Sequence, residues 1–246
     1  MSLDGHTALI TGAGQGIGKA CALVFASKGA NLLLIDKNPA TVKEVSDEVA
    51  AMGRKVIGLV LDLTMQSRLM EISKKAQKIG LIDILINNAG FDSPGTTTKI
   101  DSEKFREVLD IHVTVPLNLI KIFLPGMRSA GWGRIINVSS IYGLIGGKGE
   151  VAYSAAKAGV IGLTKSVAKE CGLDGITVNA VLPGLTRTPT IETFMDERYK
   201  KEIIANTPLG RIAEPEEIAR VIAFLASDEA SFITGVALPI SGGWGT

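Results

Sequence analysis

Short apolar runs alternate with segments of helical periodicity from one end of the chain to the other. The runs predict β-strands near residues 6–11, 31–36, 55–61, 82–87, 133–139, 176–181 and 236–240. The segments between them predict helices near residues 16–28, 40–52, 66–79, 101–130, 151–171, 191–205 and 214–227, with Pro116 as a candidate break in the fourth. Strands such as 82–87 are apolar on both faces, which is typical of a parallel sheet between two helical layers. We therefore expect residues 1–246 to form one α/β domain with a doubly wound parallel sheet of about seven strands.

Composition and charge are typical of a globular protein, and they limit the kinds of partner that we expect. Hydrophobic residues make up 46% of the 246 positions and charged residues 21%, which favours a packed core over disorder. The formal net charge of +1 predicts neither a nucleic acid nor an anionic membrane as a partner. The apolar runs, such as 31–35, are too short to span a bilayer, and residues 1–6 lack the pattern of a signal peptide. We therefore expect a cytoplasmic protein.

The few cysteines and histidines indicate no metal site. Cys21 and Cys171 lie in helical patterns among small apolar residues, which favours buried free thiols over a disulfide or a catalytic role. The two histidines, His6 and His112, have no metal-ligand spacing around them. We therefore expect that the protein binds no metal ion.

A glycine-rich turn follows the first predicted strand and precedes the first predicted helix. Residues 11–18 read Thr-Gly-Ala-Gly-Gln-Gly-Ile-Gly. This order of elements places backbone N–H groups and a helix N-terminus against a phosphate, and glycine lets the backbone approach it. The spacing of Gly12, Gly16 and Gly18 is G-x-x-x-G-x-G rather than the common dinucleotide fingerprint G-x-G-x-x-G. A glycine turn without a ligand is therefore the alternative for this motif alone.

The pair formed by Tyr153 and Lys157 is the strongest candidate for catalysis. In the helix predicted over 151–171 the two residues are one turn apart and share a face. A lysine at that position is expected to lower the tyrosine pKa, which makes the phenol a general acid or base near neutral pH. Ser140 follows the strand predicted at 133–139 and can present its hydroxyl to a substrate oxygen. A structural pair that arises by chance is the alternative, because such spacings occur on many helices.

Polar residues gather at the predicted carboxyl ends of the strands. Ligands of open parallel sheets bind outside these ends, where the strand order reverses. The residues at such positions are the glycine turn, Asp36, Asp62, Asn88, Ser140 and Pro183. Their convergence predicts one ligand site along this edge of the sheet.

Taken together, these motifs resemble those of the short-chain dehydrogenase/reductase family over the whole chain. The matching segments are 11–18, Asn87-Asn-Ala-Gly90, Asn137-Val-Ser-Ser140, Tyr153-x-x-x-Lys157, Val181-Leu-Pro-Gly184, 208–215, Ile233-Thr-Gly235 and Ser241-Gly-Gly-Trp244. The resemblance implies a Rossmann-type fold and hydride transfer between a nicotinamide and a carbinol or carbonyl carbon. The protein would then be an oxidoreductase that acts on the CH–OH group of a small-molecule substrate.

The resemblance also implies the residues that bind the cofactor. They are Gly12, Gln15, Gly16, Ile17, Gly18, Asp36, Asp62, Leu63, Asn88, Ala89, Gly90, Tyr153, Lys157, Pro183, Gly184, Thr186 and Thr188. Asp62 resembles the acid that bonds the adenine amino group, and Pro183 begins the loop that holds the nicotinamide. Helix capping is the alternative role of Thr186 and Thr188, which precede the helix predicted at 191–205.

Asp36 indicates which cofactor is used. An acid at the end of the second strand accepts hydrogen bonds from the adenosine ribose and repels a 2′-phosphate. Relatives that prefer NADP commonly carry a basic residue in the glycine turn, where this chain has Ala13 and Gln15. We therefore expect NAD, although Lys37 can offset part of the repulsion. A solvated strand-end acid without a ligand is the alternative for Asp36.

By the same resemblance, the catalytic residues are Ser140, Tyr153, Lys157 and His112. Tyr153 would move the proton, Ser140 would position the substrate oxygen, and Lys157 would hold the nicotinamide ribose. Most relatives have an asparagine in their proton relay where this chain has His112. A main-chain carbonyl at a helix distortion would preserve the relay, whereas a side-chain role would change its pH response. Packing of His112 against the sheet is the alternative.

The substrate follows from the sequence only as a chemical class. The predicted substrate-binding residues are Ser140, Tyr142, Ile145, Tyr153 and Leu185, and the segment 190–210, with Phe194, Met195 and Tyr199, is the predicted lid. Because most candidates are apolar, we expect a secondary alcohol or ketone with a hydrophobic part, or a hydroxyacyl or oxoacyl thioester. The alternatives are an NADPH-dependent 3-oxoacyl carrier-protein reductase and a non-catalytic nucleotide-binding subunit.

A homotetramer is implied by the family resemblance. Its members commonly pair two long helices, here 101–130 and 151–171, across a two-fold axis. These helices and their ends carry more apolar positions than one sheet face needs, namely Val113, Leu117, Ile120, Ile161, Val167 and Leu173. We expect some of these side chains to be exposed on an isolated subunit.

Overall fold

The computed structural model describes residues 1–245, without the side chains of Gln66 and Phe194. The predicted pocket role of Phe194 thus lies outside the described part of the chain. The described residues form one parallel sheet with the strand order β3-β2-β1-β4-β5-β6-β7. Its strands are β1 (Thr7–Thr11), β2 (Asn31–Asp36), β3 (Val56–Val60), β4 (Ile84–Asn87), β5 (Gly133–Val138), β6 (Ile176–Pro183) and β7 (Ala237–Ile240). The order reverses between β1 and β4, which confirms the predicted doubly wound sheet.

The central strands are continuous apolar runs because helices cover both of their faces. Leu32, Leu33, Leu34 and Ile35 of β2 are all fully buried. Leu33 pairs in register with Leu9 of β1, so successive side chains enter opposite layers of the core. A strand with an exposed face would alternate apolar with polar residues, and β2 does not.

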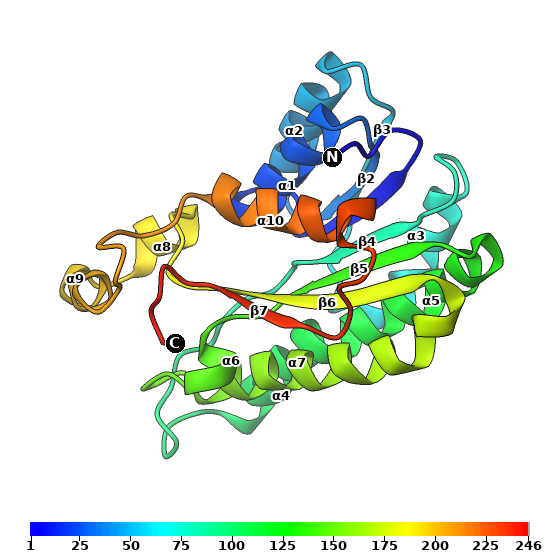
Figure 1. Ribbon diagram of the computed structural model, residues 1–246. Coiled ribbons are helices and arrows are strands. Elements are labelled where there is room, and N and C mark those ends of the chain that lie inside the picture. The colour runs from blue at the N-terminus through cyan, green and yellow to red at the C-terminus, as the bar shows by residue number, and fades with distance from the viewer. Residues whose placement is uncertain (246) are drawn as a thin grey trace.

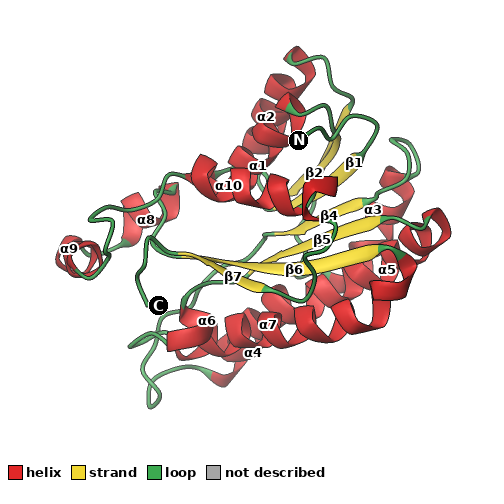
Figure 2. Ribbon diagram, in the orientation of Figure 1, coloured by secondary structure: helices red, strands yellow, loops and turns green. Residues whose placement is uncertain are grey.

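Two helical layers sandwich the sheet (Figures 1 and 2). One layer contains α1 (Gly16–Ser27), α2 (Pro39–Ala51) and α10 (Pro215–Leu225). The other contains α3 (Leu69–Ala76), α4 (Ser102–Leu109), α5 (Val115–Ala130) and α7 (Val151–Cys171). The short helices α6 (Tyr142–Ile145), α8 (Pro189–Phe194) and α9 (Glu197–Ala205) lie at the carboxyl edge of the sheet, where the ligand site was predicted.

Local sequence signals set the ends of several helices. Asn38 caps α2 by accepting the N–H groups of Ala40 and Thr41. α5 stops at Gly131, whose φ of +66° lies in the left-handed region that favours glycine. Cys21 and Cys171 are buried free thiols, as predicted.

The long helix predicted over 101–130 is interrupted, but not at Pro116. The interruption is a π-helical turn over Asp110–Thr114 that separates α4 from α5. Pro116 instead lies two residues beyond this turn, in the first turn of α5. The helix predicted over 191–205 is likewise two helices, α8 and α9, and Asp196 caps the second of them.

The segment Ser102–Ala130 corrects the expectation that the apolar runs of the chain are too short to span a bilayer. It has 29 residues, and an 18-residue window within it has a mean hydropathy of 1.4, so it is long and apolar enough to cross a bilayer by length and composition alone. In the structure Leu119 and Met127 of this segment are fully buried in the core beneath the sheet. The segment is therefore apolar because it forms part of the core.

Candidate active site

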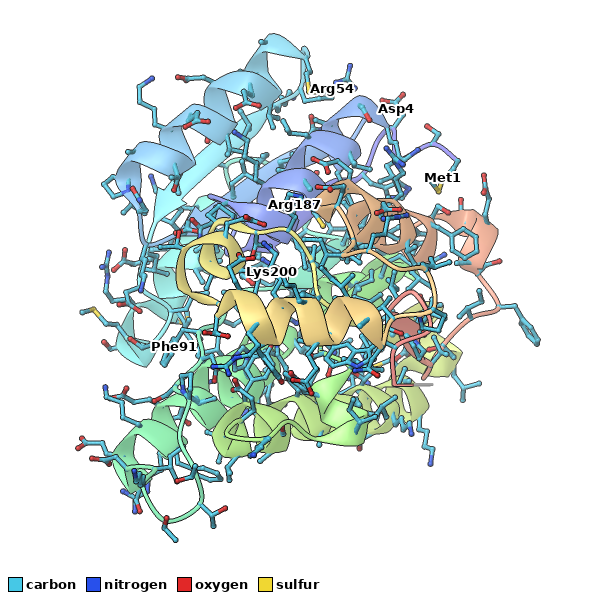
Figure 3. The ribbon with its side chains drawn as sticks, turned by 90° about the vertical axis from the view of Figure 1, so that its left-hand side faces the viewer. Met1, Asp4, Arg54, Phe91, Arg187 and Lys200 are labelled. Atoms are coloured by element: carbon cyan, nitrogen blue, oxygen red, sulfur yellow. The ribbon has the colours of Figure 1, made fainter. Side chains whose placement is uncertain are left out.

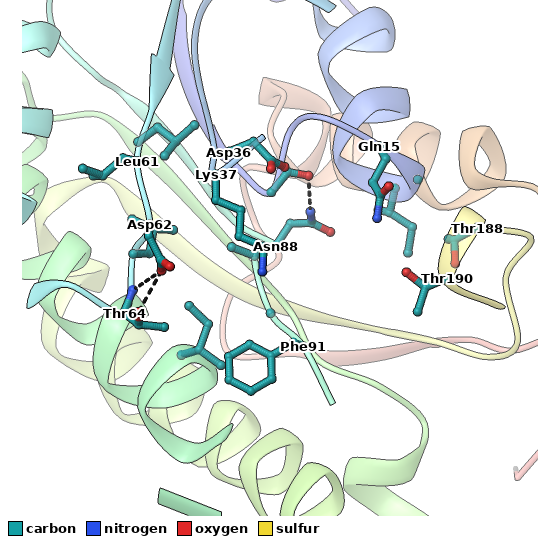
Figure 4. Close-up of a pocket in the computed structure, with 18 of the residues that line it drawn as sticks. Gln15, Asp36, Lys37, Leu61, Asp62, Thr64, Asn88, Phe91, Thr188 and Thr190 are labelled. Atoms are coloured by element: carbon teal, nitrogen blue, oxygen red, sulfur yellow. Dashed lines mark hydrogen bonds between the residues drawn. The ribbon is translucent and has the colours of Figure 1, made fainter. Parts of the chain in front are cut away.

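Two adjoining cavities open along the carboxyl edge of the sheet. The larger has a volume of about 510 Å³ and extends from the glycine turn past the ends of β2 and β3. The smaller, of about 310 Å³, lies between the end of β5, the start of α7 and the helices α8 and α9. Residues that line both are Ile17, Asn88, Gly90, Phe91, Thr188 and Thr190. The two cavities therefore form one continuous cleft, whose larger part Figure 4 shows.

The glycine turn has the geometry needed to approach a ligand closely. Gly12 and Gly16 line the larger cavity with φ of +63° and +54°, in the region where a side chain would be strained. Gly18 lies behind the turn rather than in the cavity. A Cβ atom at Gly18 would be 1.9 Å from the carbonyl oxygen of Gly12, so glycine is required for α1 to pack against β1.

The start of α1 is suited to an anion. Its first turn contains no acidic residue, and Gln15 at the N-cap makes no side-chain capping bond among the described residues. Gly16 and Ile17, the first residues of the helix, line the cavity, and the helix dipole favours negative charge there. The pyrophosphate of a dinucleotide fits this arrangement.

Thr11 and Asn88 hold the glycine turn to the end of β4. The Thr11 hydroxyl accepts the backbone N–H groups of Asn88 and Ala89, at 2.9 Å and 3.0 Å. The Asn88 amide donates to the carbonyl oxygens of Thr11 and Gly12. Thr11 was not among the predicted site residues, although it opens the glycine motif and its hydroxyl organises the loop.

Two acids stand at the far end of the larger cavity (Figure 4). Asp36 accepts the N–H of Gly14 at 3.0 Å and that of Asn38 at 3.1 Å, which fixes its carboxylate at the end of β2. Asp62 accepts the hydroxyl and the N–H of Thr64, and these bonds hold the pKa of its carboxyl below the ordinary value. Both acids can accept hydrogen bonds from the hydroxyl or amino groups of a bound nucleoside.

Ser140, Tyr153 and Lys157 meet in the smaller cavity. Ser140 lies just beyond β5, and its hydroxyl interacts with that of Tyr153 on α7. The Lys157 ammonium donates to the carbonyl oxygen of Val138 at 2.8 Å and lies 5.3 Å from the centre of the Tyr153 ring. The predicted catalytic side chains thus share one wall of the cleft.

The expected effect of Lys157 on the tyrosine pKa is wrong for this structure. Burial raises the pKa of Tyr153, and the bond with Ser140 offsets this only in part. Burial also lowers the pKa of Lys157 to about 7. The reason is that both groups are removed from water, which disfavours both the phenolate and the ammonium form.

His112 is both packed and close to the catalytic wall. It lies in the π-helical turn, where its Nε2 is 2.9 Å from the carbonyl oxygen of Phe91. Its ring meets the Tyr153 ring edge-on at 5.5 Å between centroids. Burial, and then the Lys157 charge, lower the pKa of His112 well below its ordinary value, so the ring is neutral at pH 7. A Cβ at Gly90 would lie 1.9 Å from the ring, so Gly90 makes room for the histidine.

The structure brings nearly all the predicted site residues to the cleft. Of the predicted cofactor residues, all but Gly18 line one of the two cavities, as do His112, Tyr142 and Leu185. Ile145 does not: α6 ends there, its side chain is 46% exposed, and it packs beneath the chain end at Gly245. Thr188 lines the cleft, where the cofactor role was predicted, and its side chain also caps α8.

Lining residues that the sequence did not single out for the site include Phe91, Glu150 and Trp244. Trp244 comes from the chain end and meets the Tyr142 ring edge-on at 5.4 Å. Glu150 precedes Tyr153 by one helical turn, a spacing that could have indicated a shared cavity.

The sequence and fold match those of known oxidoreductases. The family model described as enoyl-(acyl carrier protein) reductase matches residues 12–245. The 3-oxoacyl-[acyl-carrier-protein] reductase of Thermotoga maritima is 40% identical over 244 residues, which cover 99% of both chains. The corresponding Escherichia coli enzyme is 36% identical and covers 99% of this chain and 98% of its own.

Solved structures extend the likeness to other substrates. A putative NAD(P)-dependent gluconate 5-dehydrogenase from Beutenbergia cavernae has a TM-score of 0.94 and 36% identity, over 99% of this chain and 98% of that one. A 7α-hydroxysteroid dehydrogenase solved with NADH and 7-oxo glycochenodeoxycholic acid has a TM-score of 0.95 and 31% identity, over 99% and 95%. With these matches and its seven-stranded sheet, the chain belongs to the short-chain dehydrogenase/reductase family, as an NAD(P)-dependent oxidoreductase that acts on CH–OH groups.

Proposed function

We propose that the protein transfers hydride between NAD(H) and a secondary alcohol or its ketone, hydroxyacyl and oxoacyl thioesters included. One observation carries this proposal: the cavity with Ser140, Tyr153 and Lys157 is continuous with the cavity at the glycine turn. A substrate carbon in the smaller cavity would lie beside both the proton donor and one end of a dinucleotide. Such proximity converts an encounter of two ligands into a reaction within one complex.

In this proposal Tyr153 is the general acid and base. In oxidation its oxygen accepts the proton of the alcohol, and in reduction it returns a proton to the carbonyl oxygen. Ser140, whose hydroxyl interacts with that of Tyr153, donates to the same substrate oxygen and stabilises the negative charge that develops on it. The nicotinamide, when bound, accepts or supplies the hydride.

Lys157 and His112 have supporting roles next to Tyr153. The Lys157 pKa of about 7 lets this side chain hold or release a proton near neutrality. Its ammonium form would bond the nicotinamide ribose. His112 is neutral and hydrogen-bonded to Phe91, so we assign it the packing of the distorted helix rather than a proton-carrying role.

The NAD preference is proposed from the end of β2. Both oxygens of Asp36 accept backbone N–H groups, which holds the carboxylate beside the site of the adenosine ribose. A 2′-phosphate there would meet a fixed negative charge. Lys37 lines the same cavity, and its positive charge favours NADP.

A second candidate is an NADPH-dependent 3-oxoacyl carrier-protein reductase. It is favoured by the names of the curated relatives at 36–40% identity. The dehydrogenases among the structural neighbours, which have TM-scores of 0.94 and 0.95, favour the broader activity. The two candidates differ in cofactor and in the need for a thioester.

Steady-state rates would test both. We expect oxidation of cyclohexanol, butan-2-ol or 3-hydroxybutyryl-coenzyme A with NAD⁺, and a kcat/KM at least about tenfold lower with NADP⁺. Activity confined to acetoacetyl thioesters with NADPH would support the second candidate. Absence of hydride transfer with every alcohol, ketone and thioester of such a panel would contradict both.

A further inference from the structure

Two tyrosine hydroxyls join the α8–α9 segment to the turn that carries Ser140. Tyr199 lies on α9 and Tyr142 on α6, and their hydroxyls are hydrogen-bonded to each other. Tyr142 lines the smaller cavity, so this contact is made beside the substrate space. Neither residue is needed for the hydride or proton transfer described above.

Tyr142 is connected to the catalytic wall through its backbone. Its N–H donates to the Ser140 hydroxyl oxygen at 3.2 Å. One residue further along the chain, a Cβ at Gly143 would lie 2.8 Å from the carbonyl carbon of Lys157, so α6 packs closely on α7. A displacement of Tyr142 would therefore also shift Ser140 and α7, the helix that carries Tyr153.

The segment α8–α9 is held together as one unit. Lys200 of α9 forms ion pairs with Glu192 of α8 at 3.1 Å and with Glu197 at 3.6 Å. Arg187, just before α8, pairs with Glu192 and with Glu214 ahead of α10. In Figure 3, which labels Arg187 and Lys200, α9 lies across the side of the molecule between the two helical layers.

The α8–α9 unit has a weak contact through the exposed Arg187 ion pairs and a stronger one through the half-buried Tyr142 phenol. The Arg187 side chain is 50% exposed, and exposed ion pairs contribute little because water screens them. The Tyr142 phenol is half-buried, and burial raises its pKa, so it stays an un-ionised hydrogen-bond donor. Trp244 packs against the same ring and limits its rotation.

We propose that Tyr142 and Tyr199 are positioning residues: their hydrogen bond is a latch that holds α8–α9 closed over the substrate and against the turn of Ser140. The proposal rests on the proposed alcohol–ketone activity only for its kinetic readout. Opening of the latch would admit substrate and release product. Closure would exclude water from the cavity and bring Ile191, Met195 and Ile203 of the segment against the substrate.

A double-mutant cycle tests the latch. Tyr142→Phe and Tyr199→Phe each remove one hydroxyl and keep the ring. Loss of one net hydrogen bond, about 1 kcal/mol, corresponds to about a fivefold change. We expect KM for cyclohexanol, or for the best substrate of the panel, to rise about fivefold in either variant, with a smaller change in kcat. The double variant should equal the single variants, because all three lack the same bond.

Hydrogen exchange gives a second readout that needs no turnover. The backbone amides of α9 should exchange about fivefold faster in each single variant, and no faster in the double variant. Glu202→Gln, an exposed change on the same helix, is the matched control and should leave these rates unchanged. If no substrate is oxidised but the exchange rates follow this pattern, the proposed function fails and the latch stands. Wild-type exchange in the single variants, or effects that multiply in the double variant, would overturn the latch.

Discussion

At the scale of single residues, burial decides how the catalytic groups ionise. Tyr153 and Lys157 are one helical turn apart, yet Lys157 is buried and Tyr153 partly buried, and burial pushes each pKa toward the neutral form. The sequence predicts the chemical identity of such a pair, because the spacing places both groups on one face. It cannot predict the direction of their pKa shifts, because burial depends on α6, α8 and the chain end, which come from distant parts of the chain.

Tyr153→Phe tests the assignment of the proton donor. The change keeps the ring and its contact with His112 but removes the exchangeable proton. We expect kcat to fall by about 10² or more, since positioned acid–base catalysis contributes about 10²–10⁴. The dissociation constant of NADH, measured by fluorescence titration, should change little. A well-folded variant with near-normal kcat would rule Tyr153 out.

Asp36→Ala tests the choice of cofactor. Removing the carboxylate deletes a hydrogen-bond acceptor for the ribose and the charge that would repel a 2′-phosphate. The ratio of kcat/KM for NAD⁺ to that for NADP⁺ should therefore fall, by about tenfold or more. Asp47→Ala, an exposed change on α2, is a control of the same charge. A wild-type enzyme that already prefers NADP⁺ would contradict the proposal outright.

Glu150→Gln tests the charge environment of the pocket through stability. Burial, and then the neighbouring Asp92, raise the pKa of Glu150 from 4.5 to about 8. The folded protein therefore binds a proton that the unfolded chain releases, so stability is full below about pH 4.5 and declines as the pH rises toward 8. The melting temperature of the wild type should fall relative to that of Glu150→Gln over this range.

The control for this measurement lies on the same helix. Glu170→Gln makes the same charge change at the exposed far end of α7 and should show the same pH dependence as the wild type. The titration of Lys157 is common to all three proteins and cancels in the comparison. Parallel curves for the wild type and Glu150→Gln would mean that Glu150 titrates like an ordinary surface acid.

At the scale of elements, a buried polar chain joins two strands to the catalytic helix. The Asn87 amide of β4 donates to Asn137 of β5 at 2.8 Å, and the Asn137 amide donates to the Thr164 hydroxyl of α7 at 2.9 Å. Asn137 and Thr164 are fully buried. This chain of bonds fixes α7, and with it Tyr153, relative to the strand that ends at Ser140.

Asn137→Ala tests this connection. It leaves the buried Asn87 amide without its Asn137 acceptor, and an unsatisfied buried group costs about 1–3 kcal/mol. The Thr164 hydroxyl keeps its bond to the carbonyl oxygen of Val160. We expect the free energy of unfolding, from chemical denaturation, to fall by at least about 1–3 kcal/mol. Thr177→Val is the contrasting control: the Thr177 hydroxyl is buried without a partner, so its removal should be neutral or stabilising. Equal losses in both variants would argue against a specific network.

The sequence predicts most elements and misses two local breaks. Each strand and each principal helix follows from apolar periodicity, because that period directly reflects which face is buried. The π-helical turn at Asp110–Thr114 is invisible to periodicity, since it inserts one residue without changing the apolar pattern much. The break between α8 and α9 depends on the Asp196 cap, a signal that a continuous helical pattern hides.

At the scale of the whole molecule, the topology explains why the site residues converge. All strands are parallel, so the glycine turn after β1, Asp36 after β2 and Ser140 after β5 meet at one edge although they are far apart in sequence. This is why the strand ends predicted from the sequence were a good guide to the cleft. The cytoplasmic location and the assembly into a homotetramer stay predictions.

The exposure of the apolar side chains shows which of them could form the predicted interface. Ile120, Ile161 and Val167 are buried within the subunit, so they belong to its core. Leu117 on α5 is 38% exposed, and Leu173 just after α7 is fully exposed. Apolar periodicity could not separate these two groups, because a sheet and a neighbouring subunit demand the same kind of side chain.

Leu117→Glu combined with Leu173→Glu tests the assembly. We expect light scattering behind size exclusion to give the mass of four subunits for the wild type and of a smaller species for this variant, because buried carboxylates disfavour the interface. Secondary structure should be retained, since neither side chain fills the subunit core. Met70→Glu, on the exposed face of α3, is the matched control and should stay tetrameric. A wild type that is monomeric and fully active at micromolar concentration would show that the cleft needs no neighbouring subunit.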